Sequence, residues 1–326
     1  MKLTRRAAIG GLMAATVAVR KGNAAEKITC LFPAPSFLPA FMPFHIASKR
    51  GYFAANDVTV TFQSGRGGAD VAQQVGAGNA ALGVGLGDTS MIVRPNGLPV
   101  RAVAALGSHP LFQLVTRQES NVKSFADLRG KKLGVSSYQS TEYYTLLAVI
   151  AANGMKKTDL EIQAVGVAGV TQLMIAKSLD GIMAIPEWAD TIETASVPLD
   201  YHNVEKVFPT MAQAILSSDR MIAERPAAVG GFVKATMQAM RDCIADPAAA
   251  SRDFVAAVPQ QTGKEAEVER ILRRYVTQVF ATTPASALGS FDPQRLETVQ
   301  KFYLENKIIH SAVPMEDLYT NQFVSS

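Results

Sequence analysis

The sequence predicts an α/β protein made of two Rossmann-like lobes joined by a hinge. Three observations lead to this prediction. Short strand-like runs alternate with helix-like runs through the first two thirds of the chain, which is typical of sheets covered by helices on both faces. The chain has 326 residues, more than one hydrophobic core usually serves. The alternation is interrupted at residues 107–110 and again at 209–218, where the chain is expected to cross between lobes.

The individual elements follow from hydrophobic spacing. The predicted strands are 27–32, 58–62, 81–84, 100–105, one that begins at 113, 132–135, 161–165 and 181–184. The predicted helices are 41–50, which Gly51 ends, then 68–77, 89–94, 143–152, 170–177 and 186–194. Such alternation predicts parallel sheets. Beyond residue 229 the pattern is almost wholly helical, at 229–243, 247–258, 265–280 and 293–305, which predicts extra helices at the C-terminus.

The two interruptions divide the chain into lobes. If each is a crossing, residues 109–211 form one lobe, and residues 25–108 and 212–326 share the other. Ligands of such proteins bind at interfaces between lobes and at the carboxyl ends of parallel strands. We therefore expect the ligand site in the cleft between the two lobes.

Residues 1–24 have the layout of an export signal. Basic residues come first, then an uncharged run of about 13 residues, then a small-residue cleavage site after Ala24. The run is too short to span a bilayer. Thr4, Arg5 and Arg6 supply the arginine pair of a twin-arginine signal, and an ordinary secretory signal is the alternative. Either signal predicts a soluble periplasmic protein.

Charge and cysteine usage exclude several classes. Five of the 32 basic residues lie in the predicted signal, so the remaining 27 nearly balance 28 acidic ones. A neutral mature surface does not favour nucleic acid or an anionic membrane as a partner. Cys30 lies in a strand-like run and Cys243 in a helix-like one, so we expect two separate buried thiols, although export would permit a disulfide.

Five segments, taken in order, resemble one family. They are FHIA at 44–47 with GYF at 51–53, SGRGGAD at 64–70, GVGLGDTS at 83–90, FADLRGKKLGV at 125–135 and LMIAKSLDGIMAIPE at 173–187. The chain is similar to substrate-binding proteins of nitrate, sulfonate and taurine ABC importers, including relatives that bind a pyrimidine precursor of thiamine. It departs at Ser178 and Leu179, where the family usually has a Gly before the Asp, and at Asn56 and Asp57, which replace the usual Gly before the second strand.

The resemblance implies a fold, a function and partners. The fold is the two-lobed periplasmic-binding-protein fold of the type II kind. The function is to capture a small organic ligand between the lobes and deliver it to a permease and its ATPase. We expect a monomer with no cofactor and no metal. A ligand-sensing protein of the chemoreceptor type would use the same closed form and stays open as an alternative.

In the first lobe, three segments that follow strands are candidates to contact the ligand. They are Ser36 and Phe37, then Gly65, Arg66 and Gly67, then Asp88 and Thr89. Amide groups after the glycines could hold an anion, while ordinary turn formation also explains these glycines. The Asp at position 70 would repel a pyrophosphate, so a dinucleotide is excluded. A connecting loop explains the first pair equally well, and N-capping alone explains the third.

In the second lobe, two turns are candidates. Ser137, Tyr138, Ser140 and Thr141 follow a strand and begin a helix, so they present hydroxyls and free amides, and the family uses this turn for binding. Ordinary capping by Ser140 is the alternative. Glu187 and Trp188 follow the next strand, where the helix dipole alone favours the Glu. A core position is the alternative for Trp188, which is the single Trp of the chain.

These segments offer hydroxyls, amides and aromatic rings, with Arg66 as the obvious cation. We expect a ligand with one polar or anionic head and a planar or apolar body, such as a sulfonate or an aromatic carboxylate. A pyrimidine-like ligand that uses Asp88 and Glu187 as acceptors is the rival.

Catalysis finds little support in the sequence. The four histidines have no metal-binding spacing, and there is no nucleophile elbow and no phosphate-binding Walker loop. A thiamine-precursor synthase shares the expected fold, but that enzyme family carries a cysteine cluster and an iron-linked histidine, which this chain lacks. We therefore expect a binding protein that is not an enzyme.

Overall fold

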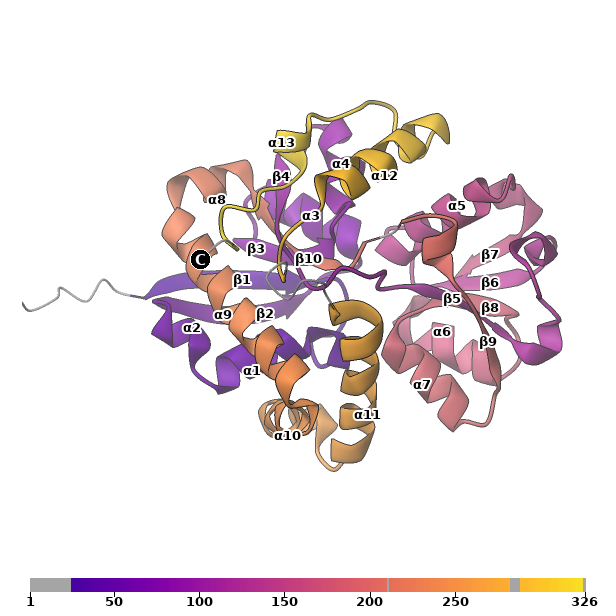
Figure 1. Cartoon of the computed structure of the whole chain (residues 1–326), viewed down its shortest axis with the longest axis horizontal. Helices are drawn as coiled ribbons and strands as arrows, with labels where there is room; N and C mark the ends of the chain where they lie inside the picture. The colour runs from indigo at the N-terminus through magenta and orange to yellow at the C-terminus, as the bar shows by residue number, and fades with distance from the viewer. Residues whose placement is uncertain (1–24, 210, 282–287, 325–326) are drawn as a thin grey trace, which may run out of the picture.

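The computed structural model describes residues 25–209, 211–281 and 288–324, and in it the chain forms two five-stranded sheets. The predicted export signal lies outside the described residues. Figure 1 shows the two sheets side by side, each covered by its own helices. We call sheet A with the helices packed on it lobe A, and sheet B with its helices lobe B. The two-lobed α/β architecture predicted from the sequence is confirmed.

Sheet A has the strand order β2-β1-β3-β10-β4. Its strands are β1 (Glu26–Phe32), β2 (Val58–Ser64), β3 (Leu82–Leu86), β4 (Val100–Ala105) and β10 (Gln213–Ser218). β1 runs parallel to both β2 and β3, with Cys30 opposite Phe62 on one side and Leu82 on the other. β3 and β10 are buried along their whole length and β1 over its second half, as a sheet covered on both faces requires.

Sheet B has the strand order β7-β6-β8-β5-β9. Its strands are β5 (Gln113–Arg117), β6 (Lys132–Val135), β7 (Glu161–Ala164), β8 (Gly181–Ala184) and β9 (Leu199–His202). The covering helices are α5 (Thr141–Ala152), α6 (Gly166–Ile175) and α7 (Pro186–Thr194). In Figure 1, α5 lies on one face of sheet B, and α6 and α7 lie on the other.

The prediction of parallel sheets is correct for only part of each sheet. β10 runs antiparallel to β3 and β4, and β5 runs antiparallel to β8 and β9. These are the first strands that the chain forms after each passage between the lobes. A strand that enters from the other lobe needs no helical crossover, and only parallel neighbours require one.

The C-terminal helices pack on lobe A. The helices of this lobe are α1 (Met42–Lys49), α2 (Tyr52–Ala55), α3 (Gly68–Gly76), α4 (Thr89–Val93), α8 (Asp219–Glu224), α9 (Pro226–Ala245), α10 (Pro247–Ala257), α11 (Glu265–Tyr275), α12 (Pro293–Glu305) and α13 (Met315–Leu318). α9 packs on α1 and α2, where Phe232 stacks on Phe53 with 5.0 Å between ring centroids. The helix predicted over 265–280 changes to a π-helical turn at Val276–Phe280.

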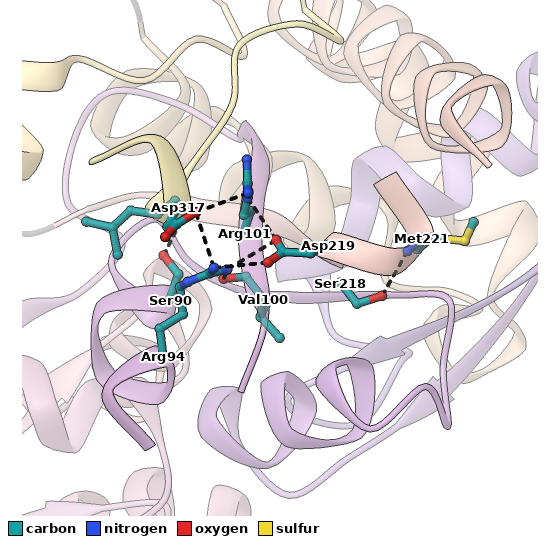
Figure 2. A network of polar contacts seen from close by, with 9 residues as sticks. Ser90, Arg94, Val100, Arg101, Ser218, Asp219, Met221 and Asp317 are labelled. Atoms are coloured by element: carbon teal, nitrogen blue, oxygen red, sulfur yellow. Dashed lines mark hydrogen bonds and ion pairs between the residues drawn. The ribbon is translucent and has the colours of Figure 1, made fainter. Parts of the chain in front are cut away.

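A polar network fixes the C-terminal segment to sheet A (Figure 2). Arg94 and Arg101 each bind both Asp219 and Asp317, at N–O distances from 2.8 to 3.4 Å. Beyond α13, the main-chain nitrogen of Thr320 donates to the carbonyl of Ala102 at 2.9 Å. The end of the described chain is therefore bonded to the edge strand β4 and to the start of α8.

Two segments connect the sheets, residues 106–112 and 203–212. Arg295 of α12 joins them, because its guanidinium donates to the carbonyls of Ser108 and Pro209 and to the carboxylate of Glu205 at 2.9 to 3.3 Å. Gly107 has φ +131°, and a Cβ atom there would collide with the carbonyl of Val279. Both connections are thus held by residues of lobe A.

One further prediction, on the cysteines, can be compared with the structure. Cys30 and Cys243 are buried and not bonded to each other, so the prediction of two separate thiols is confirmed. No helix in the described ranges is long and apolar enough to cross a bilayer. In the same ranges, no group of three or more His, Cys, Asp or Glu side chains has the geometry of a metal site.

Candidate functional site

A cavity of about 520 Å³, its opening included, lies where the two sheets face each other. Lobe A contributes the loop after β1, the start of α3 and the ends of β3 and β10, whereas lobe B contributes the starts of α5 and α7 and part of α6. The space within it that the centre of a water-sized sphere can reach is about 50 Å³. The lining residues are Pro33, Ala34, Leu38, Ala40, Phe41, Gly67, Gly68, Gly85, Leu86, Leu111, Phe112, Ser136, Ser140, Thr141, Glu142, Val167, Ile185, Trp188 and Gln213.

Aromatic rings from both lobes form the apolar part of the wall. Phe41 is held in place by Phe32, which stacks on it with 4.2 Å between ring centroids and 2° between planes. On the other side, Phe112 lies 6.5 Å from Trp188, at 45°. These fixed flat surfaces are suited to covering a planar ligand.

Glu142 is the one carboxylate in the lining, and it lies in the first turn of α5. It is 4% exposed, and the main-chain nitrogen of Ser136 donates a short hydrogen bond to its Oε1 atom. Burial raises the pKa of Glu142 to about 7, although hydrogen bonds from Ser136 and Ser140 act in the opposite direction. None of the described lining residues is Lys or Arg.

The two lobes touch at the cavity edge through the glycines at the start of α3. Gly67 has φ +117°, and a Cβ atom there would lie 2.8 Å from the carbonyl oxygen of Gln139. A Cβ atom on Gly68 would collide with Cγ2 of Thr141. The main-chain nitrogen of Ala69 donates to the Gln139 carbonyl at 3.4 Å. These glycines therefore permit close approach of the lobes. This role explains them without a bound anion.

Glu187 bridges the lobes beside Trp188. Its Oε1 accepts a hydrogen bond from the main-chain nitrogen of Ala40 at 3.2 Å, and its Oε2 accepts one from the hydroxyl of Tyr275 at 2.5 Å. Both donors belong to lobe A. The carboxyl group is buried, which raises the pKa of Glu187 to about 7 despite these bonds.

A group of ion pairs extends this bridge between α7 and α11. Arg270 holds both oxygens of Asp190 at 2.8 Å, and Arg274 binds Glu193 at 2.6 Å and lies 3.6 Å from Asp190. The Asp190 side chain is 3% exposed. We call this group the α7–α11 clasp. Bidentate pairs with a buried carboxylate are the strong kind of ion pair.

The structure brings four of the predicted site residues to the cavity: Gly67, Ser140, Thr141 and Trp188. Ser140 also caps α5, because its hydroxyl oxygen accepts from the main-chain nitrogen of Tyr143. Trp188 is 7% exposed, so its ring belongs both to the core of lobe B and to the cavity wall.

The other predicted residues lie elsewhere. Phe37 and Tyr138 are 37% and 52% exposed, Ser36 bonds to Ser64, and Ser137 accepts from the nitrogen of Gln139. Arg66 is 85% exposed and faces Asp70, while Gly65 packs on the same carboxylate. Glu187 bridges the lobes as described, and the last two, Asp88 and Thr89, are buried in lobe A.

Asp88 does not have the predicted N-cap bond. It occupies the N-cap position of α4, but its carboxylate accepts from the hydroxyl of Tyr303 at 2.6 Å. Burial raises the pKa of Asp88. The neighbouring Thr89 hydroxyl accepts from the main-chain nitrogen of Leu86 at 2.8 Å. Neither residue is among those that line the cavity.

Sequence reasoning missed four lining residues that matter for chemistry: Phe41, Phe112, Glu142 and Gln213. Glu142 could have been found, because it directly follows the predicted Ser140 and Thr141 turn. Gln213 is a polar residue inside the apolar run from 211 to 216, which is a weak signal that its side chain meets something polar.

Comparison with known proteins places the chain in a family. The NMT1/THI5-like family model matches residues 38–250. The riboflavin-binding protein RibY of Chloroflexus aurantiacus is 26% identical over 320 residues, which cover 95% of this chain and 90% of RibY. The 4-amino-5-hydroxymethyl-2-methylpyrimidine phosphate synthase of Aspergillus parasiticus is 22% identical, over 67% of each chain.

Solved structures agree on the fold. The alkanesulfonate-binding protein SsuA from Xanthomonas axonopodis pv. citri superposes with a TM-score of 0.67 at 15% identity, covering 92% of this chain and 99% of SsuA. The fold is that of periplasmic binding proteins, related to ABC substrate-binding proteins, and the predicted resemblance is confirmed. The chain belongs to the NMT1/THI5-like family.

Proposed function

We propose that this protein is an extracytoplasmic solute-binding protein that encloses a planar nitrogen heterocycle between its lobes. It delivers this ligand to an ABC permease that is driven by an ATPase. The observation that carries the proposal is the cavity between the lobes, with Phe41, Phe112 and Trp188 in its wall and a single carboxyl group, Glu142, in its lining.

The polar groups favour a heterocycle over a sulfonate. An anionic head would approach the carboxyl group of Glu142, and no cation in the described lining would offset the repulsion. The expected cation, Arg66, points to solvent. The pyrimidine-like ligand, the rival in the sequence analysis, is therefore preferred, with Glu142 in place of Asp88 and Glu187. The name of RibY supports the same class, because riboflavin contains a fused pyrimidine ring.

Capture proceeds by closure of the lobes. We propose that residues 25–108 with 212–326 move as one unit against residues 109–211, about the two connections. Contacts made only when the cleft is shut, such as those of Glu187 with Ala40 and Tyr275, stabilise the closed form. A ligand can drive closure only by as much as it binds the closed form better than the open one. We keep the twin-arginine signal and the periplasmic location as part of this proposal.

The single Trp of the chain gives a direct test. Trp188 lines the cavity, so its fluorescence should report a ligand that stacks there. We expect saturable quenching by riboflavin or by 4-amino-5-hydroxymethyl-2-methylpyrimidine, and none by taurine, methanesulfonate or benzoate. Trp188→Phe is the control: it should abolish the signal and leave binding in equilibrium dialysis within a few fold. Saturable binding of a sulfonate with no binding of either heterocycle would refute the ligand class.

A further inference from the structure

Two buried polar side chains from opposite lobes line the cavity, and one of them has no hydrogen-bond partner in the described protein. Glu142 lies on α5 of lobe B and is 4% exposed, and Gln213 lies on β10 of lobe A and is 3% exposed. No hydrogen bond of the side-chain amide of Gln213 is found among the described residues, whereas Glu142 is hydrogen-bonded to Ser136 and Ser140. A nearly buried amide without a partner destabilises the protein. A partner inside the cavity would remove that cost.

From this pair we propose that Glu142 and Gln213 together bind the N–H edge of a lactam or imide ring, such as the pyrimidinedione ring of a flavin. This inference rests on the proposed function and specifies the part of the ligand that the protein recognises.

The chemistry of the two groups selects this edge. The amide of Gln213 presents an acceptor and a donor side by side, which matches a ring N–H next to a ring carbonyl. A carboxyl oxygen of Glu142 accepts from a second ring or hydroxyl donor, and in its protonated form it donates to a carbonyl. The raised pKa of Glu142 makes both forms available near neutral pH. A site that hydrogen-bonds a substrate N–H strongly rejects an analogue that lacks it, because the protein groups are then left unpaired.

The same cavity has flat apolar surface. Phe112 and Trp188 both line it, with 6.5 Å between their ring centroids. Thr141 also lines the cavity, and no hydrogen bond of its Oγ1 is found within the described residues. The cavity thus combines aromatic rings with polar groups, as recognition of a flat ring with a polar edge requires.

The test changes the ligand and the protein in parallel. The probes are riboflavin and 3-methylriboflavin, which has the same rings but a methyl group in place of the ring N–H. The variants are Gln213→Met and Glu142→Gln, and the matched controls are Gln163→Met and Glu161→Gln on β7, outside the cavity lining. Affinities are measured by equilibrium dialysis, and folding is checked by circular dichroism.

We expect the wild type to prefer riboflavin over its methyl derivative by at least tenfold. Gln213→Met should weaken riboflavin by tenfold or more, leave 3-methylriboflavin within about twofold, and so abolish the preference. Glu142→Gln should weaken both flavins and keep part of the preference. The β7 controls should behave as wild type. Because the methyl derivative tests the edge in the unaltered protein, a variant that fails to fold does not remove the test.

Four outcomes would overturn the inference. If the wild type binds both flavins equally well, the N–H edge is not read, although the proposed function stands. The same holds if Gln213→Met keeps the full preference. If the aminopyrimidine binds and neither flavin does, the lactam edge is wrong and the heterocycle class survives. Binding of a sulfonate alone would remove the proposed function as well.

Discussion

Asp190 offers the sharpest test of how the lobes are held together. Its side chain is 3% exposed, and Arg270 binds both of its oxygens at 2.8 Å across the gap between α7 and α11. Asp190→Asn keeps the size of the side chain and one acceptor, but it removes the negative charge that the two lobe A arginines surround. We expect this change to favour the open form.

The magnitude follows from the exposure of the two partners. Two hydrogen bonds to charged groups contribute about 1.5–3 kcal/mol each in a dry site. Arg270 is 47% exposed, however, and exposed ion pairs contribute about 0.2–1 kcal/mol. A value of about 2 kcal/mol lies between these limits, and it corresponds to a change of about thirtyfold in the closure equilibrium.

Two measurements test this effect. Small-angle X-ray scattering of the ligand-free protein gives the radius of gyration. Equilibrium dialysis gives the affinity for the ligand that Trp188 fluorescence identifies. We expect Asp190→Asn to increase the radius of gyration and to weaken ligand binding by up to thirtyfold. Glu269→Gln is the matched control, because Glu269 pairs with Arg273 on the same helix, within lobe A. That pair is worth at most about 0.5 kcal/mol. If the two variants have the same radius and the same affinity, the α7–α11 clasp does not hold the lobes closed.

Three other predictions follow from the same geometry and from the sequence. Burial raises the pKa of Glu187 from 4.5 to about 7, so the folded protein keeps a proton that the unfolded chain releases. Below a pH of about 4.5 this difference adds its full contribution, about 3 kcal/mol, to the free energy of unfolding. The contribution is lost as the pH rises towards 7. Glu187→Gln should therefore reduce the pH dependence of the free energy of unfolding, measured with urea, between pH 5 and 8. An unchanged pH dependence would show that Glu187 is not its source. Gly68→Ala should hold the lobes apart, because the added Cβ meets Cγ2 of Thr141; adding Thr141→Ser, which lacks that methyl group, should restore the wild-type radius of gyration. If the double variant stays as open as Gly68→Ala, the collision is not the reason. Replacing Arg5 and Arg6 with Lys should leave precursor in the cytoplasm, as fractionation and immunoblotting would detect; mature protein at wild-type levels in the periplasm would refute the twin-arginine route.

Local pattern was sufficient to predict most elements and insufficient to predict how they pair. The runs at 27–32 and 132–135 have the apolar character of buried strands, and both form strands nearly as predicted. The antiparallel direction of β5 and the strand β10 itself were not predicted. A strand's direction depends on the element from which the chain arrives. Hydrophobic spacing carries no such information.

The same limit applies to the site. Ser140 and Thr141 were placed at the cavity because a turn after a parallel strand leads to the cleft in this kind of fold. Asp88 follows a strand in the same way, yet it binds Tyr303, which is 215 positions further along the chain. Gln213 was missed, because one glutamine beside an apolar run looks like an ordinary strand end until β3 is seen next to it.

The place of β10 in sheet A has a consequence for the order in which the chain folds. β10 lies between β3 and β4, so β4 joins the sheet only through a strand that starts at Gln213. A chain emerging from the ribosome can therefore complete sheet B, which is continuous from Gln113 to His202, while sheet A still lacks its fourth strand. Lobe A is thus the first lobe whose strands are synthesised and the last lobe to be completed. Until then, the apolar edges of β3 and β4 are unpaired, and such edges are the surfaces on which nascent chains aggregate.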